Sequence, residues 1–514
     1  MKGQTPALLP AFAAVVIFLA SPAPARNRLD EVIVRFSEKT TGPELQRVLD
    51  ENGAHVDGEI TALRLMKLKL PPGHSLDTVL ARLGKFPGME LAEPNAIIHQ
   101  AGIPNDYGLT GSQWGLEKIG AVKAWGMTVT GAMGDASVII AVLDTGIMST
   151  HEEMQGKLVE GVNIVTPGTK PEDDEFHGTY VAGIAAAATD NSAGIAGVAW
   201  KARLMPIKIL KSDGTGDEFG MISGMNWALD HGARVINMSV GSCNTDGTCS
   251  PGSHFGAEAM EKAWRRGAIL VAATGNEGIK GASYPASYPY VLGVGSTDNA
   301  DRRSRFSNFG GMVDLMAPGG DCSLTASTDI LGPGITTNAS YIVACGTSAS
   351  APFVSGLAAV LLAQDPTRTN AEVVRIMEST ADPIDGAGWN EMTGYGRINM
   401  YKALVGQENA PPSSSLSTYN YPNPFSPRLD RGTSFVVHNL DGRELSIEIR
   451  DMHGNILWTK QYTAAEAAGM DLYYNSQLRW DGRDSKGKMV PNGVYFATVK
   501  AGSAHNLVKV AVVH

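Results

Sequence analysis

The feature that most restricts the fold of this chain is a series of short, continuously apolar segments separated by helical patterns. Five such segments are 138–143, 204–210, 234–240, 268–273 and 290–294. Helical spacing is found between them, at 220–230 and 256–266. Continuous apolar strands that alternate with helices are typical of a parallel sheet covered on both faces. The sequence therefore predicts a doubly wound α/β domain that binds ligands at the carboxyl ends of its strands.

The segments that precede this domain predict an export signal and a small separate unit. Lys2, an apolar run over 7–20 and the small residues at 23–25 are typical of a secretory signal peptide spanning 1–25. The alternative, a membrane anchor, needs a longer uninterrupted apolar run. Residues 26–103 then predict a small α+β (ferredoxin-like) unit, with strands at 31–36, 63–70 and 96–99 and helices at 44–52 and 76–83.

The chain that follows the α/β domain, itself assigned to 104–406, has a different composition. Residues 407–418 are rich in proline and serine and indicate a linker. Short strands separated by turns then predict an antiparallel β-sandwich over 419–514. The expected strands are 433–437, 444–449, 455–459, 478–480, 494–500 and 507–513.

The net charge restricts the kinds of binding partner, and the cysteine content restricts the disulfide bonds that an exported chain can form. The formal net charge of −10 excludes the basic stripe of a nucleic-acid-binding protein. Four cysteines in an exported chain indicate two disulfides, for which three sets of pairs exist. Cys243 and Cys249 flank one polar loop, so we favour a local bridge there and a second bridge between Cys322 and Cys345.

A hydroxyl surrounded by small residues marks one end of the expected sheet. Ser348 lies in the stretch 345–352, directly before the apolar helical run 353–362. Pro352 suits the first turn of that helix, which places Ser348 close to the positive end of the helix dipole. A serine in this position is commonly an N-cap. Only partners elsewhere in the chain distinguish a nucleophile from a cap.

Three polar residues provide such partners. Asp144 ends the first core strand, His177 precedes a small-residue helix at 180–188, and Asn276 follows the strand at 268–273. Each alone has a structural explanation, as a cap, a buried histidine or a turn amide. Together, Asp, His and Ser occur in the order of one known catalytic triad. The α/β-hydrolase alternative requires another order and a glycine at position 350, which is serine.

With these motifs the chain resembles the subtilases, the subtilisin-like serine peptidases, and in particular their thermitase-like branch. The resemblance covers 104–404 and is supported by the stretches 191–199, 237–241 and 284–286. It implies that Ser348 is the nucleophile, His177 its base and Asp144 the orienting acid. The Asn276 side chain and the Ser348 backbone N–H would stabilise the oxyanion. The substrates would be proteins or peptides.

The resemblance also assigns a substrate cleft. Its walls would be Ser239, Val240 and Gly241 on one side and Ala273, Thr274 and Gly275 on the other, with Ser283 at the floor and Gly214 as a further substrate-binding residue. Glu218 would border the S4 pocket, where it either favours a basic P4 residue or is a solvated surface charge.

A structural calcium ion (Ca²⁺) is implied by the loop 189–195, which resembles the calcium site of the family. The implied all-oxygen ligand set is Asp106, Glu153, Thr189, Asn191, Ala193 and Ile195, with Glu153 in place of the usual aspartate. Residues 31–100 resemble the subtilase propeptide, which assists folding and inhibits the enzyme until it is removed. We expect autocleavage between Gln100 and Pro104.

The tail from Tyr421 resembles the immunoglobulin-like, flagellar-hook-capping-type modules of bacterial secreted proteins. It would serve in sorting or surface attachment, or as a passive spacer. The sequence thus predicts a secreted, self-processed, monomeric serine endopeptidase inhibited by its own propeptide, without nucleic-acid partner or membrane span. The alternative is a binding or surface protein that keeps the subtilase fold without turnover.

Overall fold

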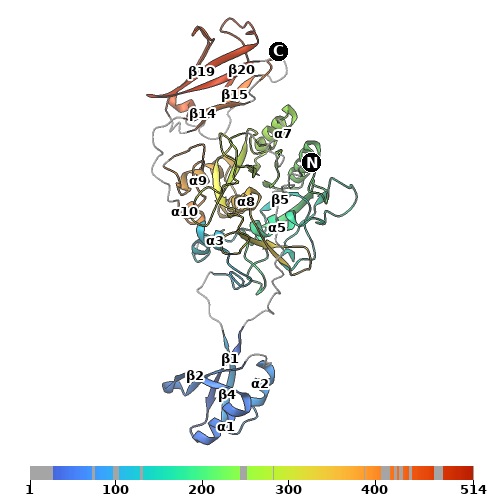
Figure 1. Ribbon diagram of the computed structural model, residues 1–514, viewed down its shortest axis with the longest axis vertical. Helices are drawn as coiled ribbons and strands as arrows, with labels where there is room; N and C mark the ends of the chain where they lie inside the picture. Colours follow the sequence, from blue (N-terminus) through green and yellow to red (C-terminus); the bar gives the residue numbers. More distant parts are fainter. Residues whose placement is uncertain are drawn as a thin grey trace, which may run out of the picture. The chain divides into compact units, whose positions relative to one another are not determined.

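The computed structural model of the chain contains two compact units (Figure 1). The elements β1 to β4 belong to one unit and all later elements to the other. The structure describes residues 27–71, 76–96, 103–127, 131–243, 252–281, 283–386, 388–406, 417–421, 425–427, 432–438, 443–467 and 478–512. The expected signal peptide 1–25, most of the linker 407–418, Gln100 and Cys249 lie outside these residues.

The N-terminal unit is a four-stranded antiparallel sheet with two helices. Its strand order is β2-β3-β1-β4, with β1 (Asn27–Phe36), β2 (His55–Ile60), β3 (Leu65–Lys69) and β4 (Met89–Ala96). A single 3-10 turn, Thr61–Leu63, joins β2 to β3. Helix α1 (Gly42–Asn52) begins with a capping box between Thr41 and Glu44, and α2 (Leu76–Leu83) follows β3.

The strands of this unit differ in part from the expectation. Strands β2 and β4 were not predicted, and residues 97–99 of the last expected strand, 96–99, lie outside the described residues. Strand β4 pairs only with β1 and so lies at an edge of the sheet, where Pro94 is tolerated although it lacks an N–H. Every residue of β2 is exposed. Because the strand has no buried face, its sequence lacks the alternation of apolar and polar residues by which a half-buried strand is predicted.

The second unit contains a seven-stranded parallel sheet in the order β11-β10-β9-β8-β5-β7-β6. Its strands are β5 (Ile139–Asp144), β6 (Val162–Asn163), β7 (Arg203–Lys208), β8 (Val235–Met238), β9 (Ile269–Ala273), β10 (Val291–Thr297) and β11 (Leu315–Pro318). All residues of β8 to β11 are buried, as expected for strands covered on both faces. The predicted parallel sheet is therefore confirmed, with β6 and β11 as additions.

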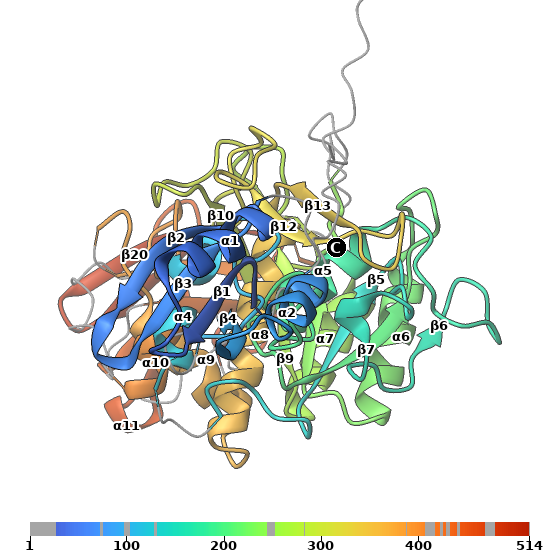
Figure 2. The same cartoon turned by 90° about the horizontal axis from the view of Figure 1, so that it is seen from below.

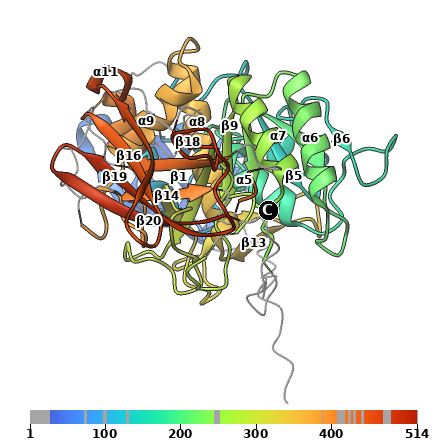
Figure 3. The same ribbon diagram turned by 90° about the horizontal axis from the view of Figure 1, so that it is seen from above.

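Alternate residues of each strand face different helices. Ile140 and Val142 of β5 pack in one apolar core with helices α5 (His177–Ala186) and α8 (Thr347–Gln364). Ala141 and Leu143 pack in the other core with α6 (Glu218–Asp230) and α7 (His254–Arg265), which lie side by side (Figures 2 and 3). Helix α8 is long and apolar enough to cross a membrane, but 94% of it is buried inside this domain.

Shorter elements complete the domain. Helices α3 (Trp114–Lys118), α4 (Ala121–Trp125), α9 (Asn370–Thr380) and α10 (Met400–Val405) add to the core of α5 and α8. The antiparallel hairpin of β12 (Ile330–Pro333) and β13 (Tyr341–Ala344) leads directly into the stretch that begins α8. A 3-10 turn, Glu152–Met154, follows β5.

The C-terminal part consists of two antiparallel sheets that share one apolar core. One sheet is β14 (Ser417–Tyr421), β15 (Thr433–His438) and β18 (Arg479–Trp480). The other is β17 (Ile456–Tyr462), β16 (Leu445–Arg450), β19 (Gly493–Ala501) and β20 (Ala504–Val512), and the short helix α11 (Ala464–Ala467) follows β17. This agrees with the predicted antiparallel strands; the immunoglobulin-like character stays a prediction.

Candidate active site

Asp144 and His177 form a buried hydrogen-bonded pair. Asp144 is the last residue of β5 and His177 the first of α5, and the imidazole Nδ1 lies 2.8 Å and 2.9 Å from the two carboxylate oxygens. Because a carboxylate only accepts, Nδ1 carries the proton and Nε2 is the basic atom. Burial disfavours the charged imidazole, but the Asp144 carboxylate, with two further carboxylates described below, raises the pKa of His177.

Ser348 is held by Ser239, the residue directly after β8. It is the second residue of α8, and its hydroxyl donates to the carbonyl oxygen of Ser239 at 3.1 Å. The Ser239 hydroxyl in turn donates to the Ser348 carbonyl at 2.9 Å. Helices α5 and α8 pack against each other, so His177 and Ser348 lie on contacting elements. The direct Ser348–His177 contact that a triad requires stays a prediction.

The expected start of α8 was wrong. Pro352 lies inside the helix, six residues into it, and not in its first turn. A proline there cannot donate to the carbonyl four residues earlier, which is that of Ser348. The Ser239 hydroxyl supplies the missing donor. The structure thus compensates for a residue that normally breaks a helix, and the same bond fixes the backbone at Ser348.

Asn276 is oriented by the residue that precedes Ser348. Its Oδ1 accepts from the Thr347 backbone N–H at 2.8 Å and from the Thr347 hydroxyl at 3.0 Å. Since the oxygen is thereby identified, Nδ2 is the donor end of the amide. A Cβ atom at Gly346 would lie 3.5 Å from this Nδ2, so the amide lies next to the start of α8. The sequence motifs alone did not indicate Thr347, although its position beside the candidate nucleophile could have indicated a role.

The structure brings together part of the predicted substrate cleft. The Ser283 side chain is completely buried, and a Cβ atom at Gly241 or Gly275 would lie 3.3 or 3.4 Å from its hydroxyl oxygen. Ser283 therefore lies between the two predicted walls, of which Ala273 and Thr274 are buried and Val240 is half-buried. Gly214 lies in an exposed turn that closes on Lys211, and its role stays a prediction.

Glu218 was weighed as a solvated surface charge or a determinant of P4 preference. It is half-buried, and its carboxylate accepts a hydrogen bond from the Tyr288 hydroxyl, which itself accepts from the Ser253 backbone N–H at 2.6 Å. The carboxylate thus joins the starts of α6 and α7. The Glu218 carboxylate is therefore not a fully solvated surface charge.

Two carboxylates of the predicted calcium site are completely buried. Glu153 Oε1 accepts from the Ile195 N–H at 2.7 Å and the Tyr341 hydroxyl at 2.9 Å, and Asp106 Oδ2 accepts from the Asn191 N–H at 3.3 Å. Within the described ranges, Asp106 Oδ1 and Glu153 Oε2 have no hydrogen-bond partner. Burial raises the pKa of Asp106 to about 7 and that of Glu153 well above its usual range.

The loop that carries the other predicted ligands lies in close contact with the Glu153 carboxylate. A Cβ atom at Gly194 would lie 1.9 Å from Glu153 Oε1, so only glycine fits there. Asn191 Oδ1 accepts from the Ala193 N–H at 2.9 Å, and the Thr189 hydroxyl accepts from the Gly197 N–H at 3.0 Å. No group of three or more His, Cys, Asp or Glu side chains suited to a metal occurs in the described part of the chain. The remaining oxygens would have to come from amide and backbone groups.

Comparison with known proteins assigns this arrangement to a family. Residues 135–396, slightly more than half of the chain, match the family model described as "Subtilase family". The chain belongs to the subtilase family. Residues 20–95 of this subtilase match a second model, the "Fervidolysin N-terminal prodomain". The prodomain match covers most of the N-terminal unit described above.

Similar proteins agree with the assignment. This subtilase is 38% identical to the thermophilic serine proteinase of Bacillus sp. (strain AK1) over 378 residues, which are 73% of this chain and 87% of the relative. It is 38% identical to thermitase of Thermoactinomyces vulgaris over 303 residues, 59% of this chain and 99% of the relative. A solved protease structure from Pseudoalteromonas arctica PAMC 21717 has a TM-score of 0.51 and 26% identity, and covers 60% of this chain and 99% of that chain. The subtilase is a serine-type endopeptidase.

A disulfide lies close to the candidate nucleophile. Cys322 and Cys345 are bonded, which confirms one predicted bridge, and Cys345 is three residues before Ser348. The buried Asp329 carboxylate holds the loop of Cys322, because it accepts from the backbone N–H groups of Asp321 and Cys322, both at 2.8 Å, and of Leu324.

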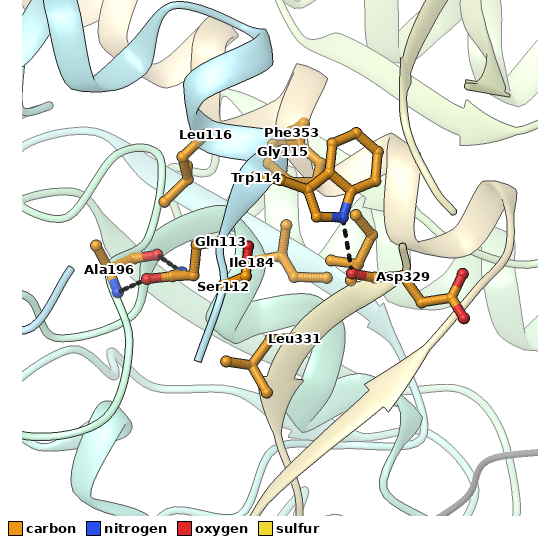
Figure 4. Close-up of a pocket in the computed structure, with 11 residues that line it drawn as sticks. Ser112, Gln113, Trp114, Gly115, Leu116, Ile184, Ala196, Asp329, Leu331 and Phe353 are labelled. Atoms are coloured by element: carbon orange, nitrogen blue, oxygen red, sulfur yellow. Dashed lines mark hydrogen bonds between the residues drawn. The ribbon is translucent and has the colours of Figure 1, made fainter. Parts of the chain in front are cut away.

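The pocket drawn in Figure 4 is not lined by any of the predicted catalytic residues. It is lined by residues of 112–116 and of the β12 strand, with Ile184, Ala196 and Phe353. Two of its polar side chains are already paired: Gln113 donates to and accepts from the Ala196 backbone, and the Trp114 indole N–H donates to the Asp329 carbonyl at 3.0 Å. We assign no catalytic role to this pocket.

Proposed function

We propose that this subtilase hydrolyses peptide bonds through an acyl-enzyme formed on Ser348. The observation that carries the proposal is the buried Asp144–His177 pair, placed at a strand end and a helix start in a chain with the Asp-His-Ser order. His177 Nε2 removes the proton of the Ser348 hydroxyl as the oxygen attacks the substrate carbonyl carbon. The hydroxyl must first leave the Ser239 carbonyl.

The reaction then proceeds in two halves. The C–N bond breaks when the imidazolium returns its proton to the leaving amine, and the acyl group remains on the serine oxygen. Water, deprotonated by His177, attacks the ester carbonyl carbon; the bond from that carbon to the Ser348 oxygen then breaks, the acid leaves, and the imidazolium returns its proton to the serine oxygen. In both halves Asp144 stabilises the imidazolium without taking its proton. The Asn276 Nδ2 and the Ser348 backbone N–H at the start of α8 donate to the oxyanion.

We infer that the enzyme is made as an exported zymogen. The prodomain match and the compact N-terminal unit support an inhibitory propeptide that is removed by cleavage between Gln100 and Pro104. The predicted signal peptide supports export through the secretory pathway. After cleavage, the mature chain would begin close to Asp106.

We also propose that the loop 189–195 holds Ca²⁺. The residues fit this ion, because two completely buried carboxylates, Asp106 and Glu153, each keep an unpaired oxygen, as far as the described residues show. Oxygen donors are what this hard cation prefers. The side chain of Asn191 and backbone carbonyls of Thr189, Ala193 and Ile195 would complete the set. The ion would neutralise the two carboxylates and stabilise the loop.

The Ser348→Ala variant of the full chain tests the catalytic proposal. We expect it to accumulate with its propeptide attached and to lack activity on casein and on peptide anilides, because no other group replaces the nucleophile. Ser350→Ala, which alters a buried serine two residues further on, serves as the control and should process itself. Processing and activity in Ser348→Ala would refute the mechanism. Inactivity of the wild type on all such substrates would favour a binding protein.

A further inference from the structure

One carboxylate in the turn before His177 collects an unusual number of hydrogen bonds. The turn 172–175 consists of four consecutive acidic residues. The second of them, Asp173, accepts five hydrogen bonds. Its Oδ1 accepts from the Thr145 hydroxyl at 2.8 Å and from the Glu175 and Phe176 N–H groups at 3.0 Å. Its Oδ2 accepts from the Thr179 N–H at 2.9 Å and the Thr179 hydroxyl at 2.6 Å.

These bonds connect the two elements that carry the candidate acid and base. Thr145 directly follows Asp144 at the end of β5, and its hydroxyl also accepts from the Gly178 N–H at 2.9 Å. Gly178 directly follows His177 at the start of α5. Asp173, Thr145 and the first turn of α5 therefore form a closed set of hydrogen bonds around the Asp144–His177 contact. A shift of either element would break several of them at once.

The same carboxylate acts on His177 electrostatically. The ring lies at the first residue of a helix, where the dipole disfavours a positive charge, and it is buried. The charged groups that oppose these effects and raise the pKa of His177 are Asp144, Glu175 and Asp173. Glu175 also accepts from the His177 backbone N–H at 3.0 Å. The cation on the far side of Thr145 is Lys208, which donates to the Thr145 carbonyl and to Asp174.

We propose that Asp173 is a positioning residue for catalysis. Through Thr145 and the start of α5 it fixes the Asp144–His177 geometry, and its charge favours the imidazolium that forms during the reaction. The inference rests on the proposed triad mechanism, in which His177 must be neutral to accept a proton and charged to return it. Asp173 itself does not touch the reacting atoms.

The Asp173→Asn variant tests this role with almost no change of volume. An amide keeps one acceptor oxygen but places an NH2 group against N–H and O–H donors on its other side. We expect kcat to fall about 10- to 100-fold, with KM nearly unchanged, because misplaced catalytic groups slow the chemical step. Glu172→Gln is the matched control, because it removes the same charge from the same turn, and among the described residues the Glu172 carboxylate is hydrogen-bonded to Ser149 alone. It should stay within about twofold of wild type.

The pH profile separates positioning from simple loss of stability. Activity requires neutral His177, so the acid limb of kcat/KM follows its pKa. Removal of a nearby negative charge lowers that pKa, and the limb should move to lower pH by about 0.3 to 1 unit in Asp173→Asn. Glu175 is present in every variant, so its own titration cancels in the comparison. Glu172→Gln should shift the limb much less.

A second variant tests the hydrogen bonds without any change of charge. Thr145→Val should lower kcat and leave the acid limb in place, and Thr145→Ser, which keeps the hydroxyl, should restore kcat. Active sites are titrated with a sulfonyl fluoride and melting temperatures are recorded, so that unfolded or unprocessed enzyme is not counted.

Two outcomes overturn the inference: an unmoved acid limb in Asp173→Asn, or an equal shift in Glu172→Gln. Either result, with Ser348→Ala inactive, removes the role of Asp173 and leaves the mechanism intact. An active Ser348→Ala instead refutes the mechanism itself.

Discussion

Substitution of Asn276 by leucine should remove one of the two proposed oxyanion donors without a large change in side-chain volume. The structure fixes this amide in advance, because its oxygen is held by both the backbone N–H and the hydroxyl of Thr347. A preoriented donor acts on the charge that develops in the transition state and less on the neutral substrate. The loss should therefore appear in kcat, at about 10²- to 10³-fold or about 2.7–4 kcal/mol, with KM little changed.

The contribution of the orientation itself can be measured with Thr347→Val. This variant removes the bond of the hydroxyl to Asn276 and the acceptor of the Gly275 N–H, and it keeps the bond of the backbone N–H to Asn276. One neutral hydrogen bond is worth about 1 kcal/mol, so kcat should fall about fivefold. In the double variant with Asn276→Leu, the threonine substitution should have a smaller effect than it has alone, because there is no amide left to orient and only the bond from the Gly275 N–H is then lost.

The assay is steady-state hydrolysis of a peptide anilide, normalised by active-site titration. Asn299→Leu, which changes an exposed asparagine of a surface loop in the same chemical way, is the control and should match wild type. The reasoning is refuted if Asn276→Leu raises KM and leaves kcat unchanged, since the amide would then bind the substrate and the transition state equally. A Thr347→Val effect as large as that of Asn276→Leu would contradict the assigned division of roles.

Three further predictions concern stability and are measured by calorimetry in the Ser348→Ala background, which prevents autolysis. Phe176 has φ +118°, which costs about 1 kcal/mol of strain, but its ring packs against the core of α5 and α8, and loss of that burial costs about 1.5–3 kcal/mol; Phe176→Gly should therefore lower the melting temperature by roughly 2 °C, and a higher value contradicts this. Calcium at about 100-fold its Kd should stabilise the protein by about 2.7 kcal/mol, and chelation should reverse the gain. The gain should vanish in Glu153→Gln; an unchanged gain excludes the proposed site. Asp329→Asn weakens three hydrogen bonds to a buried carboxylate and should cost about 2–3 kcal/mol, whereas an unchanged melting temperature would show that the loop does not need them.

Local patterns were sufficient for the parallel sheet because its strands are continuously apolar and buried on both faces. Apolar patterns did not predict β2, whose residues are all exposed, or β6, which has only two residues. Local patterns also misplaced the start of α8, since Pro352 inside a helix contradicts local preference. That helix is stabilised there by a hydroxyl 113 positions earlier in the chain, on Ser239, which no local pattern contains.

By itself, the sequence determined the residue types and chain order of the candidate site. Asp144, His177 and Ser348 lie in short motifs at strand ends and helix starts. Such motifs can be recognised in the sequence without knowledge of the fold. Only the tertiary structure showed how these residues are held. Asp173 and Thr347 are ordinary polar residues in the sequence, and their roles arise from partners that approach only when separate strands and helices pack. A hydrogen bond depends on distances of a few tenths of an ångström, and those distances are set by the packing of the whole domain.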